Sequence, residues 1–317
     1  MADKIATRAA YGQALKEFGG DTRIIALDAD LGKSTMSAVF GEAYPERYFD
    51  MGIAEANMAG VGAGLASTGK IVFIHSFAVF APGRIYDQIR NSIAYPGLNV
   101  KIIGSHAGVT VGQDGATHQA LEDIALMRAL PGMTVLSPCD ANETRLCVKA
   151  MIERDGPFYM RTGRLAVPQI TGDLPGYRFE LGKGAVLAQG SDVTIIATGY
   201  MVAGALEAAR LLGEAGVSAR VIDIHTIKPL DEEIIIKAAR ETGGIVTAEE
   251  HNIIGGLGGA VAEVLAEHCP TPLERVGVKD VFGHSGDPEA LVEHFGLMPG
   301  DIVAAAKRVV ARRATNN

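Results

Sequence analysis

The chain has 317 residues, 48% of them hydrophobic and 21% charged, which is typical of a folded globular protein with room for two domains. Its formal net charge of −8 argues against a general nucleic-acid-binding surface, although local arginines could still bind phosphate groups. The three cysteines are too few and too scattered for a disulfide framework or a zinc site, so we expect reduced thiols in a cytosolic protein. We expect neither a signal peptide nor a membrane span.

Short β-branched runs alternate with helical runs in the first half of the chain, a pattern that predicts parallel βαβ units. In order, the pattern predicts a helix over 7–18, strands over 24–30 and 48–53, a helix over 55–67, a strand over 71–76, a helix over 84–94, a strand over 100–104, a helix over 119–130, and strands over 133–136 and 158–161. Asp140 and Glu143 are spaced as in a capping box that begins a further helix.

Residues 166–179 contain Pro and Gly without a sustained hydrophobic period, so we predict a linker there. A second α/β block follows, with strands over 193–198, 219–224, 245–248 and 273–278, helices over 203–214, 231–240 and 255–268, and two C-terminal helices. We therefore predict an α/β protein with two domains, residues 1–165 and 180–317, each a mostly parallel sheet flanked by helices.

Glu55 is the only charged residue between Gly52 and Gly69, in a nearly uncharged part of the chain. It stands where a short extended run turns into a helix of small residues, so we expect its carboxyl group to be buried. Burial would favour the neutral form, and a neutral acid in an apolar slot can donate a hydrogen bond to a ring nitrogen. The plainer alternative is an acid at a helix start, stabilised by the helix dipole.

Loops that follow the carboxyl ends of strands form the site in open parallel sheets. Four such loops in the first domain carry side chains suited to chemistry: Asp28, Asp30, Lys33 and Ser34 in the first, Glu55 in the second, His75, Phe77 and Phe80 in the third, and His106, Asp114 and His118 in the fourth. The second domain has no comparable density, so we place the site in the first.

The last of these loops, with His106, Asp114 and His118, admits several interpretations. Its spacing matches no compact zinc pattern, so hydrogen bonds to a polyhydroxylated substrate suit it better than a metal ion. The histidines could also move protons near neutral pH, or the three side chains could satisfy their own backbone.

Phe77 and Phe80 could sandwich a flat heterocycle beside Glu55, or pack in the core. Arg161 and Arg164, at the end of a strand, could bind a phosphate through their forked donors, or remain solvated.

Taken together, the motifs resemble the C-terminal half of transketolase, namely its pyrimidine-binding domain followed by its C-terminal domain. The resemblance covers essentially all of the chain. The matching segments are TRAA (7–10), DADLGKS (28–34), FDMGIAEANMAG (49–60), HSFAVF (75–80), SHAGVTVGQDGATHQ (105–119), DVTIIATG (192–199), TIKPLD (226–231) and TAEEHNIIGGLG (247–258).

The resemblance implies thiamine diphosphate as cofactor, with Glu55 in the position of the glutamate that contacts the ring nitrogen of the aminopyrimidine. It gives the other candidates the following roles: Phe77 and Phe80 line the pyrimidine pocket, Asp30 lies beside cofactor contacts, His106 and His118 are substrate-site histidines, Asp114 contacts a sugar hydroxyl, and Arg8, Ser34 and one of Arg161 and Arg164 bind the phosphate end. A third aromatic of the family would fall near Gly83, so that part of the pocket wall is altered.

The diphosphate and magnesium motif of the family, G-D-G followed by a downstream Asn, is missing from this sequence. The resemblance therefore implies a second polypeptide that carries the diphosphate-binding domain and binds most of the magnesium, in a heterotetramer with two chains of each kind. The small-residue helix after Glu55 is a candidate contact surface.

The function implied is that of a transferase, the C-terminal subunit of a split transketolase that moves a two-carbon ketol unit between sugar phosphates. A 1-deoxyxylulose-5-phosphate synthase-like activity and a 2-oxo acid dehydrogenase β-like subunit are the nearest alternatives. A non-catalytic regulatory half is an alternative of another class.

Overall fold

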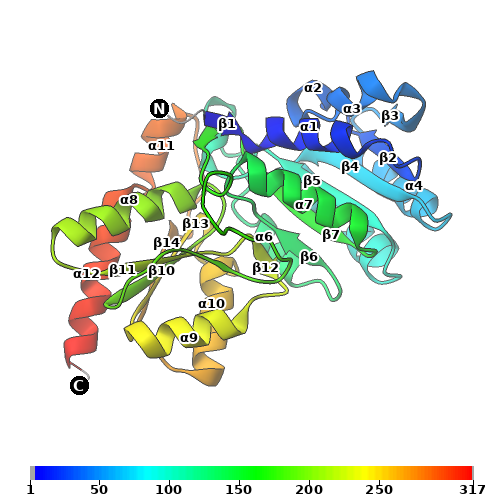
Figure 1. The fold of residues 1–317 in the computed structure, drawn as a ribbon. Coiled ribbons are helices and arrows are strands. Elements are labelled where there is room, and N and C mark those ends of the chain that lie inside the picture. The colour runs from blue at the N-terminus through cyan, green and yellow to red at the C-terminus, as the bar shows by residue number, and fades with distance from the viewer. Residues whose placement is uncertain (1–3, 316–317) are drawn as a thin grey trace.

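The computed structural model describes residues 4–315, which form two α/β domains side by side (Figure 1). The first domain contains β1 (Lys4–Ala6), α1 (Thr7–Phe18), β2 (Ile24–Asp28), α2 (Gly32–Thr35), α3 (Ala38–Ala43), η1 (Pro45–Arg47), β3 (Tyr48–Asp50), α4 (Glu55–Ala66), β4 (Ile71–Phe77), η2 (Val79–Arg84), α5 (Tyr86–Gln88), η3 (Ile89–Ala94), β5 (Val100–Ser105), η4 (Val109–Asp114), α6 (Asp123–Arg128), β6 (Thr134–Leu136), α7 (Ala141–Glu153), β7 (Phe158–Thr162) and β8 (Ala166–Pro168).

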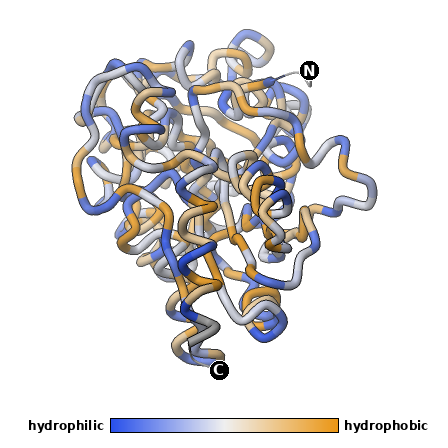
Figure 2. The backbone as a smooth tube through the Cα atoms, turned by 90° about the vertical axis from the view of Figure 1, so that its left-hand side faces the viewer, coloured by the Kyte–Doolittle hydropathy of each residue, from blue (hydrophilic) through white to orange (hydrophobic). Residues whose placement is uncertain are grey.

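The second domain follows after the linker. It contains β9 (Ala185–Ala188), β10 (Val193–Ala197), α8 (Met201–Glu214), β11 (Ala219–Asp223), β12 (Thr226–Lys228), α9 (Glu232–Thr242), β13 (Ile245–Asn252), α10 (Leu257–His268), β14 (Leu273–Val278), α11 (Pro288–His294) and α12 (Pro299–Thr315). The alternation of hydrophobic and hydrophilic segments along the backbone in Figure 2 is typical of helices and strands with one buried face.

The first domain is built on a seven-stranded sheet with the order β12-β6-β7-β5-β4-β2-β3, parallel except for β12. Strands β2 and β4 are buried along their whole length, as expected for a parallel sheet covered on both faces. Helices α1 and α7 pack together on one face, around Tyr11 and Phe73, and α4 packs on the other, around Met58 and Ile74. The predicted fold class is confirmed.

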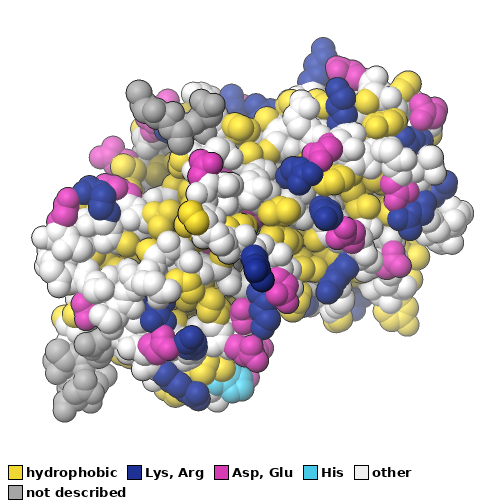
Figure 3. Space-filling model, viewed as in Figure 1, with side chains coloured by type: hydrophobic (Ala, Val, Ile, Leu, Met, Phe, Trp, Pro, Cys, Tyr) yellow, Lys and Arg dark blue, Asp and Glu magenta, His cyan; other side chains and the backbone are white. Residues whose placement is uncertain are grey.

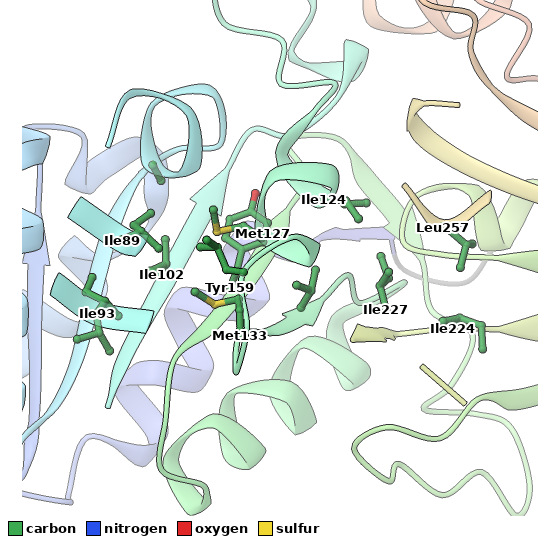
Figure 4. Packing of buried hydrophobic residues seen from close by; sticks show 14 of the residues in the cluster. Ile89, Ile93, Ile102, Ile124, Met127, Met133, Tyr159, Ile224, Ile227 and Leu257 are labelled. Atoms are coloured by element: carbon green, nitrogen blue, oxygen red, sulfur yellow. The ribbon is translucent and has the colours of Figure 1, made fainter. Parts of the chain in front are cut away.

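The two domains share a continuous core. The second sheet has the order β14-β13-β10-β11-β9. Strand β12 follows it in the chain yet pairs antiparallel with β6 of the first sheet, and β8, within the predicted linker, pairs antiparallel with β1. Figure 4 shows the resulting cluster, which runs from Ile89 and Ile102 through Tyr159 to Ile224 and Leu257. Packing of this kind fixes the position of one domain relative to the other.

Two predicted helices differ from the structure. Over 84–94 the chain forms two π-helical turns, η2 and η3, around a single short turn of α-helix, α5, although Ile85, Ile89 and Ile93 are buried as the four-residue spacing predicts. Pro82 lies inside η2 and has no N–H to continue a regular helix. The predicted helix over 119–130 shortens to α6, because the Gln119 amide instead donates to loop carbonyls, among them that of His284.

The predicted capping box forms in a modified way. The Asp140 carboxylate accepts from the backbone N–H of Glu143 at 2.9 Å, but Glu143 accepts from the backbone N–H of Cys139 and not of Asp140. Asp140 also accepts from the backbone N–H groups of Ile170 and Thr171. This fully buried carboxylate therefore connects the start of α7 to the linker.

Among residues 4–315, we find no helix with the length and hydropathy needed to cross a bilayer. Figure 3 shows acidic and basic side chains interspersed on one face of the molecule, without a large patch of either sign.

We predict that Asp140→Ala destabilises the protein by about 3 kcal/mol, because several buried donors lose their acceptor. Asp287 is the matched control, since it caps α11 but is exposed, and Asp287→Ala should cost about 1 kcal/mol. Thermal unfolding of both variants measures the difference. Equal losses would show that Asp140 does no more than cap its helix.

Candidate active site

The candidate site lies at the carboxyl edge of the first sheet. Strands β2, β4, β5 and β7 run parallel, so the loops that follow them emerge at one edge. Asp30 and Ser34 follow β2, Phe80 follows β4, and the loop with His106 follows β5. This is the edge at which open α/β sheets bind their ligands.

Glu55 begins α4 and is only 4% exposed, so the predicted burial is confirmed. Its Oε1 accepts a hydrogen bond of 2.6 Å from Nη1 of Arg84, which is itself about half exposed. The prediction of a neutral carboxyl group is wrong for this state of the protein. The guanidinium supplies a positive charge at hydrogen-bond distance, which favours the ionised carboxylate over the neutral acid.

The aromatic pair forms one wall and not two. The ring centroids of Phe77 and Phe80 are 6.2 Å apart and the planes differ by 5°. A flat ring inserted between them would need about 7 Å, twice a normal contact distance, so the predicted sandwich does not fit. The Arg84 Cζ atom lies 4.1 Å from the Phe80 ring centroid, so the guanidinium rests on the same aromatic ring that the site offers a ligand.

Both predicted histidines contact this wall. The His106 ring stacks on Phe77 with centroids 4.1 Å apart, and the His118 ring meets Phe80 edge-on at 5.3 Å. A continuous series of contacts therefore leads from Glu55 through Arg84 to the histidines. Their loop turns sharply, with a left-handed φ of 58° at His106 and of 83° at Gly112.

His106 is held in a defined state by its surroundings. It is 4% exposed, and its Nδ1 lies 2.8 Å from the Ser105 hydroxyl. Burial, with the nearby charges of Arg8 and Arg164, lowers the pKa of His106 to about 3. The ring is thus neutral at physiological pH, and offers one donor and one acceptor.

Arg8 and Arg164 form a positively charged corner beside His106. The Arg8 Nη1 donates to the Ser34 carbonyl at 2.7 Å, and the Arg164 Nη1 donates to the Val111 carbonyl at 2.6 Å. Burial and the charge of Arg164 lower the pKa of Arg8. Each guanidinium keeps further N–H groups that a phosphate could accept from.

Arg161 is committed elsewhere, which removes it as a phosphate ligand. It is 6% exposed, its Nε lies 3.1 Å from Asp123, and its two terminal nitrogens donate to the Glu250 carbonyl. Tyr159 donates a further hydrogen bond to Asp123. The difference arises because Arg161 lies within β7 at the domain boundary, whereas Arg164 lies beyond the end of that strand.

Asp30 and Asp114 lie at the rim of the site, and both are exposed. Asp30 has a left-handed φ of 62°, and its N–H donates to Asp50 at 3.1 Å. It lines a polar hollow with Ser34 and Tyr48. Asp114 ends η4 in the loop that carries both histidines.

Sequence reasoning missed two residues of this region, Arg84 and Glu250. The Glu250 Oε1 accepts from the backbone N–H of Thr110 in the histidine loop at 2.8 Å, and burial raises the pKa of Glu250 to about 7. Gly108 allows this contact, since a Cβ there would overlap the Glu250 carboxylate. Arg84 lies outside the matching segments. Glu250 lies inside one, but in the second domain, where no site was expected.

The histidine loop does not form a metal centre in the described part of the chain. The one cluster there with three ligand atoms within 4.8 Å of one another consists of Cys139, Glu143 and Asp223, all buried. The Glu143 oxygens already accept from the Tyr177 hydroxyl and the Cys139 N–H. We therefore assign no ion to this cluster.

Comparison with known proteins agrees with this geometry. The model of the transketolase pyrimidine-binding domain matches residues 3–169, and that of the transketolase C-terminal domain matches residues 182–302. The chain therefore belongs to the transketolase family. Within that family it is an enzyme subunit of the split type, a transferase that acts with a partner subunit.

Similar proteins of matching length carry names of split enzymes. The 6-deoxy-6-sulfo-D-fructose transketolase subunit SqwH of Clostridium sp. (strain MSTE9) is 48% identical, over 96% of this chain and 95% of its own. An apulose-4-phosphate transketolase subunit of Phocaeicola vulgatus is 40% identical, over 97% and 98%. A solved structure described as a split gene transketolase, inactive beta4 tetramer, is 53% identical with a TM-score of 0.88, over 98% and 99%.

We predict that the two arginines of β7 and its loop separate cleanly by stability. Arg161→Met leaves the fully buried Asp123 carboxylate without its cation and should cost about 3–5 kcal/mol. Arg164→Met should cost less than about 1 kcal/mol. Thermal unfolding of both variants checks this, and a stable Arg161→Met protein would contradict the structural role.

We also predict that His106 does not titrate between pH 8 and 5. Because its folded pKa lies below that of the unfolded chain, the neutral ring stabilises the fold above about pH 6.5, and this contribution is lost as the pH falls toward 3. NMR of the imidazole protons, assigned with His106→Asn, measures the pKa directly. A midpoint near 6.5 would contradict the burial described above.

Proposed function

We propose that this chain provides the half of a thiamine-diphosphate-dependent transketolase that holds the cofactor's aminopyrimidine and the sugar phosphate. The enzyme would transfer a two-carbon ketol unit between sugar phosphates of the pentose phosphate type. The observation that carries the proposal is the continuous wall from Glu55 through Phe80 to the histidines, which ends at Arg8 and Arg164.

The pocket beside Glu55 fits an aminopyrimidine. A planar group with N–H donors, the Arg84 guanidinium, already lies on Phe80 and bonds the Glu55 carboxylate. An aminopyrimidine is also planar and also presents nitrogen to that carboxylate. When bound, thiamine diphosphate supplies the electron sink for breaking the carbon–carbon bond. Glu55 would hold the ring nitrogen, Phe77 and Phe80 would form the wall beside the ring, and Asp30 would lie near the cofactor.

The substrate would lie along the histidine loop. Neutral His106 can donate to or accept from a sugar hydroxyl, and His118 and Asp114 stand where further hydroxyl groups would pass. Arg8, Arg164 and Ser34 would bind the terminal phosphate. We choose Arg164 over Arg161 for this role because Arg161 is consumed by Asp123.

A partner subunit would supply the diphosphate and magnesium site. In support, the G-D-G motif is absent from this sequence, and the relatives named above are themselves subunits. Helix α4 exposes Gly60, Val61 and Gly64, which would let a second backbone approach. We infer an α2β2 heterotetramer with its cofactor between subunits. The buried free thiols of Cys139 and Cys147 suit a reducing cytoplasm.

The alternatives differ in their products. A 1-deoxyxylulose-5-phosphate synthase would condense pyruvate with glyceraldehyde phosphate, whereas the proposed enzyme would use xylulose phosphate and ribose phosphate. A 2-oxo acid dehydrogenase β-like subunit would require a lipoyl-bearing partner. A regulatory half would bind cofactor in the assembled pair without turnover of sugar phosphates.

We predict that Glu55→Gln lowers ketol transfer by the reconstituted pair at least about 100-fold, while assembly with the partner is retained. The amide keeps the size of the side chain but cannot exchange the same proton. Glu46→Gln, on an exposed residue before the same loop, is the matched control and should retain full activity. Turnover by Glu55→Gln at the wild-type rate would remove Glu55 from the mechanism.

A further inference from the structure

Arg84 is the one group that contacts both features of the pocket among the described residues. Its Nη1 donates to Glu55 at 2.6 Å while its Cζ lies 4.1 Å from the Phe80 ring centroid. A ring nitrogen cannot take the same position on Oε1 while the guanidinium remains there. Arg84 and the aminopyrimidine therefore compete for one place.

Arg84 is also able to leave. Its side chain is 49% exposed, and it ends the π-helical turn η2, just before Ile85 departs from helical geometry. Wide turns of this kind are common at functional sites. At the neighbouring Gly83, no described heavy atom lies within 4 Å of where a Cβ would stand, so the wall is open beside Arg84.

The departure of Arg84 changes the state of Glu55. With the guanidinium beside it, the carboxylate is ionised and paired. Without a cation, a carboxyl group that is 4% exposed favours its protonated form, because burial disfavours the charge. One proton then passes from solvent to the carboxylate, while Arg84 keeps its own charge and moves into water.

Resting on the proposed function, we propose that Arg84 is an internal ligand of the cofactor pocket, which closes the free subunit and couples aminopyrimidine binding to proton uptake by Glu55. The closed form holds Glu55 ionised on Arg84. The open form holds Glu55 protonated, able to donate to the ring nitrogen. Ligand affinity is reduced by the fraction of molecules that are closed.

The test uses the full chain without its partner and the fragment 4-amino-5-hydroxymethyl-2-methylpyrimidine, which lacks the charged parts of the cofactor. Calorimetry in mildly alkaline buffers of different ionisation enthalpy yields both affinity and proton uptake. The wild-type chain should take up close to one proton per fragment bound. Arg84→Met should bind about tenfold more tightly and take up almost none, because Glu55 is already protonated.

Two variants control for charge and shape. Arg90 is exposed in the neighbouring turn η3, so Arg90→Met removes the same charge and should behave as wild type. Arg84→Lys keeps the charge but loses the planar donor group, and should lie between wild type and Arg84→Met. It also serves if Arg84→Met folds poorly.

Equal affinity and equal proton uptake in wild type and Arg84→Met would overturn the inference, as would weaker binding by Arg84→Met or fragment binding by none of the variants. Failure of the proposed function has a different signature. In that case Glu55→Gln would leave thiamine diphosphate binding by the reconstituted pair unchanged.

Discussion

A carboxyl group removed from water needs either a proton or a positive partner, and Glu55 is the residue on which that constraint acts most strongly. In the structure its partner is Arg84, which lies on Phe80. The small residues of α4 bring the helix close to the sheet and leave Glu55 at its mouth. The pocket is thus defined by one dry acid and one aromatic ring, both of which suit a flat nitrogen heterocycle.

The parallel sheet of the first domain makes this arrangement possible, but the second domain holds it in place. Glu250 accepts from Thr110, and the Gln119 amide donates to the His284 carbonyl, so both ends of the histidine loop are anchored across the domain boundary. The buried Arg161–Asp123 pair lies at the same boundary. The second domain therefore acts on the site by positioning, although it supplies none of the proposed ligands.

Most of the fold could be predicted because hydrophobic periodicity reports burial. The helix over Thr7–Phe18 begins and ends as predicted, and the buried strands of both sheets lie close to their predicted positions. The pairings of β8 and β12 could not be predicted, because short edge strands join by contacts distant in sequence. The π-helical turns around Pro82 escaped for a related reason, since their spacing of buried isoleucines is also that of an α-helix.

The candidate site was predictable in its loops and less so in its pairings. The sequence shows which residues follow each strand, but it does not show that Arg84 lies on Glu55 or that Arg161 is buried. Both depend on which side of the chain a long, flexible side chain takes. The measurement that tests the account most directly is a crystal structure of this chain assembled with its partner, thiamine diphosphate and magnesium. We expect the aminopyrimidine on Phe80, its ring nitrogen within hydrogen-bond distance of Glu55, and Arg84 displaced. A cofactor bound elsewhere, with Arg84 still on Glu55, would contradict the account.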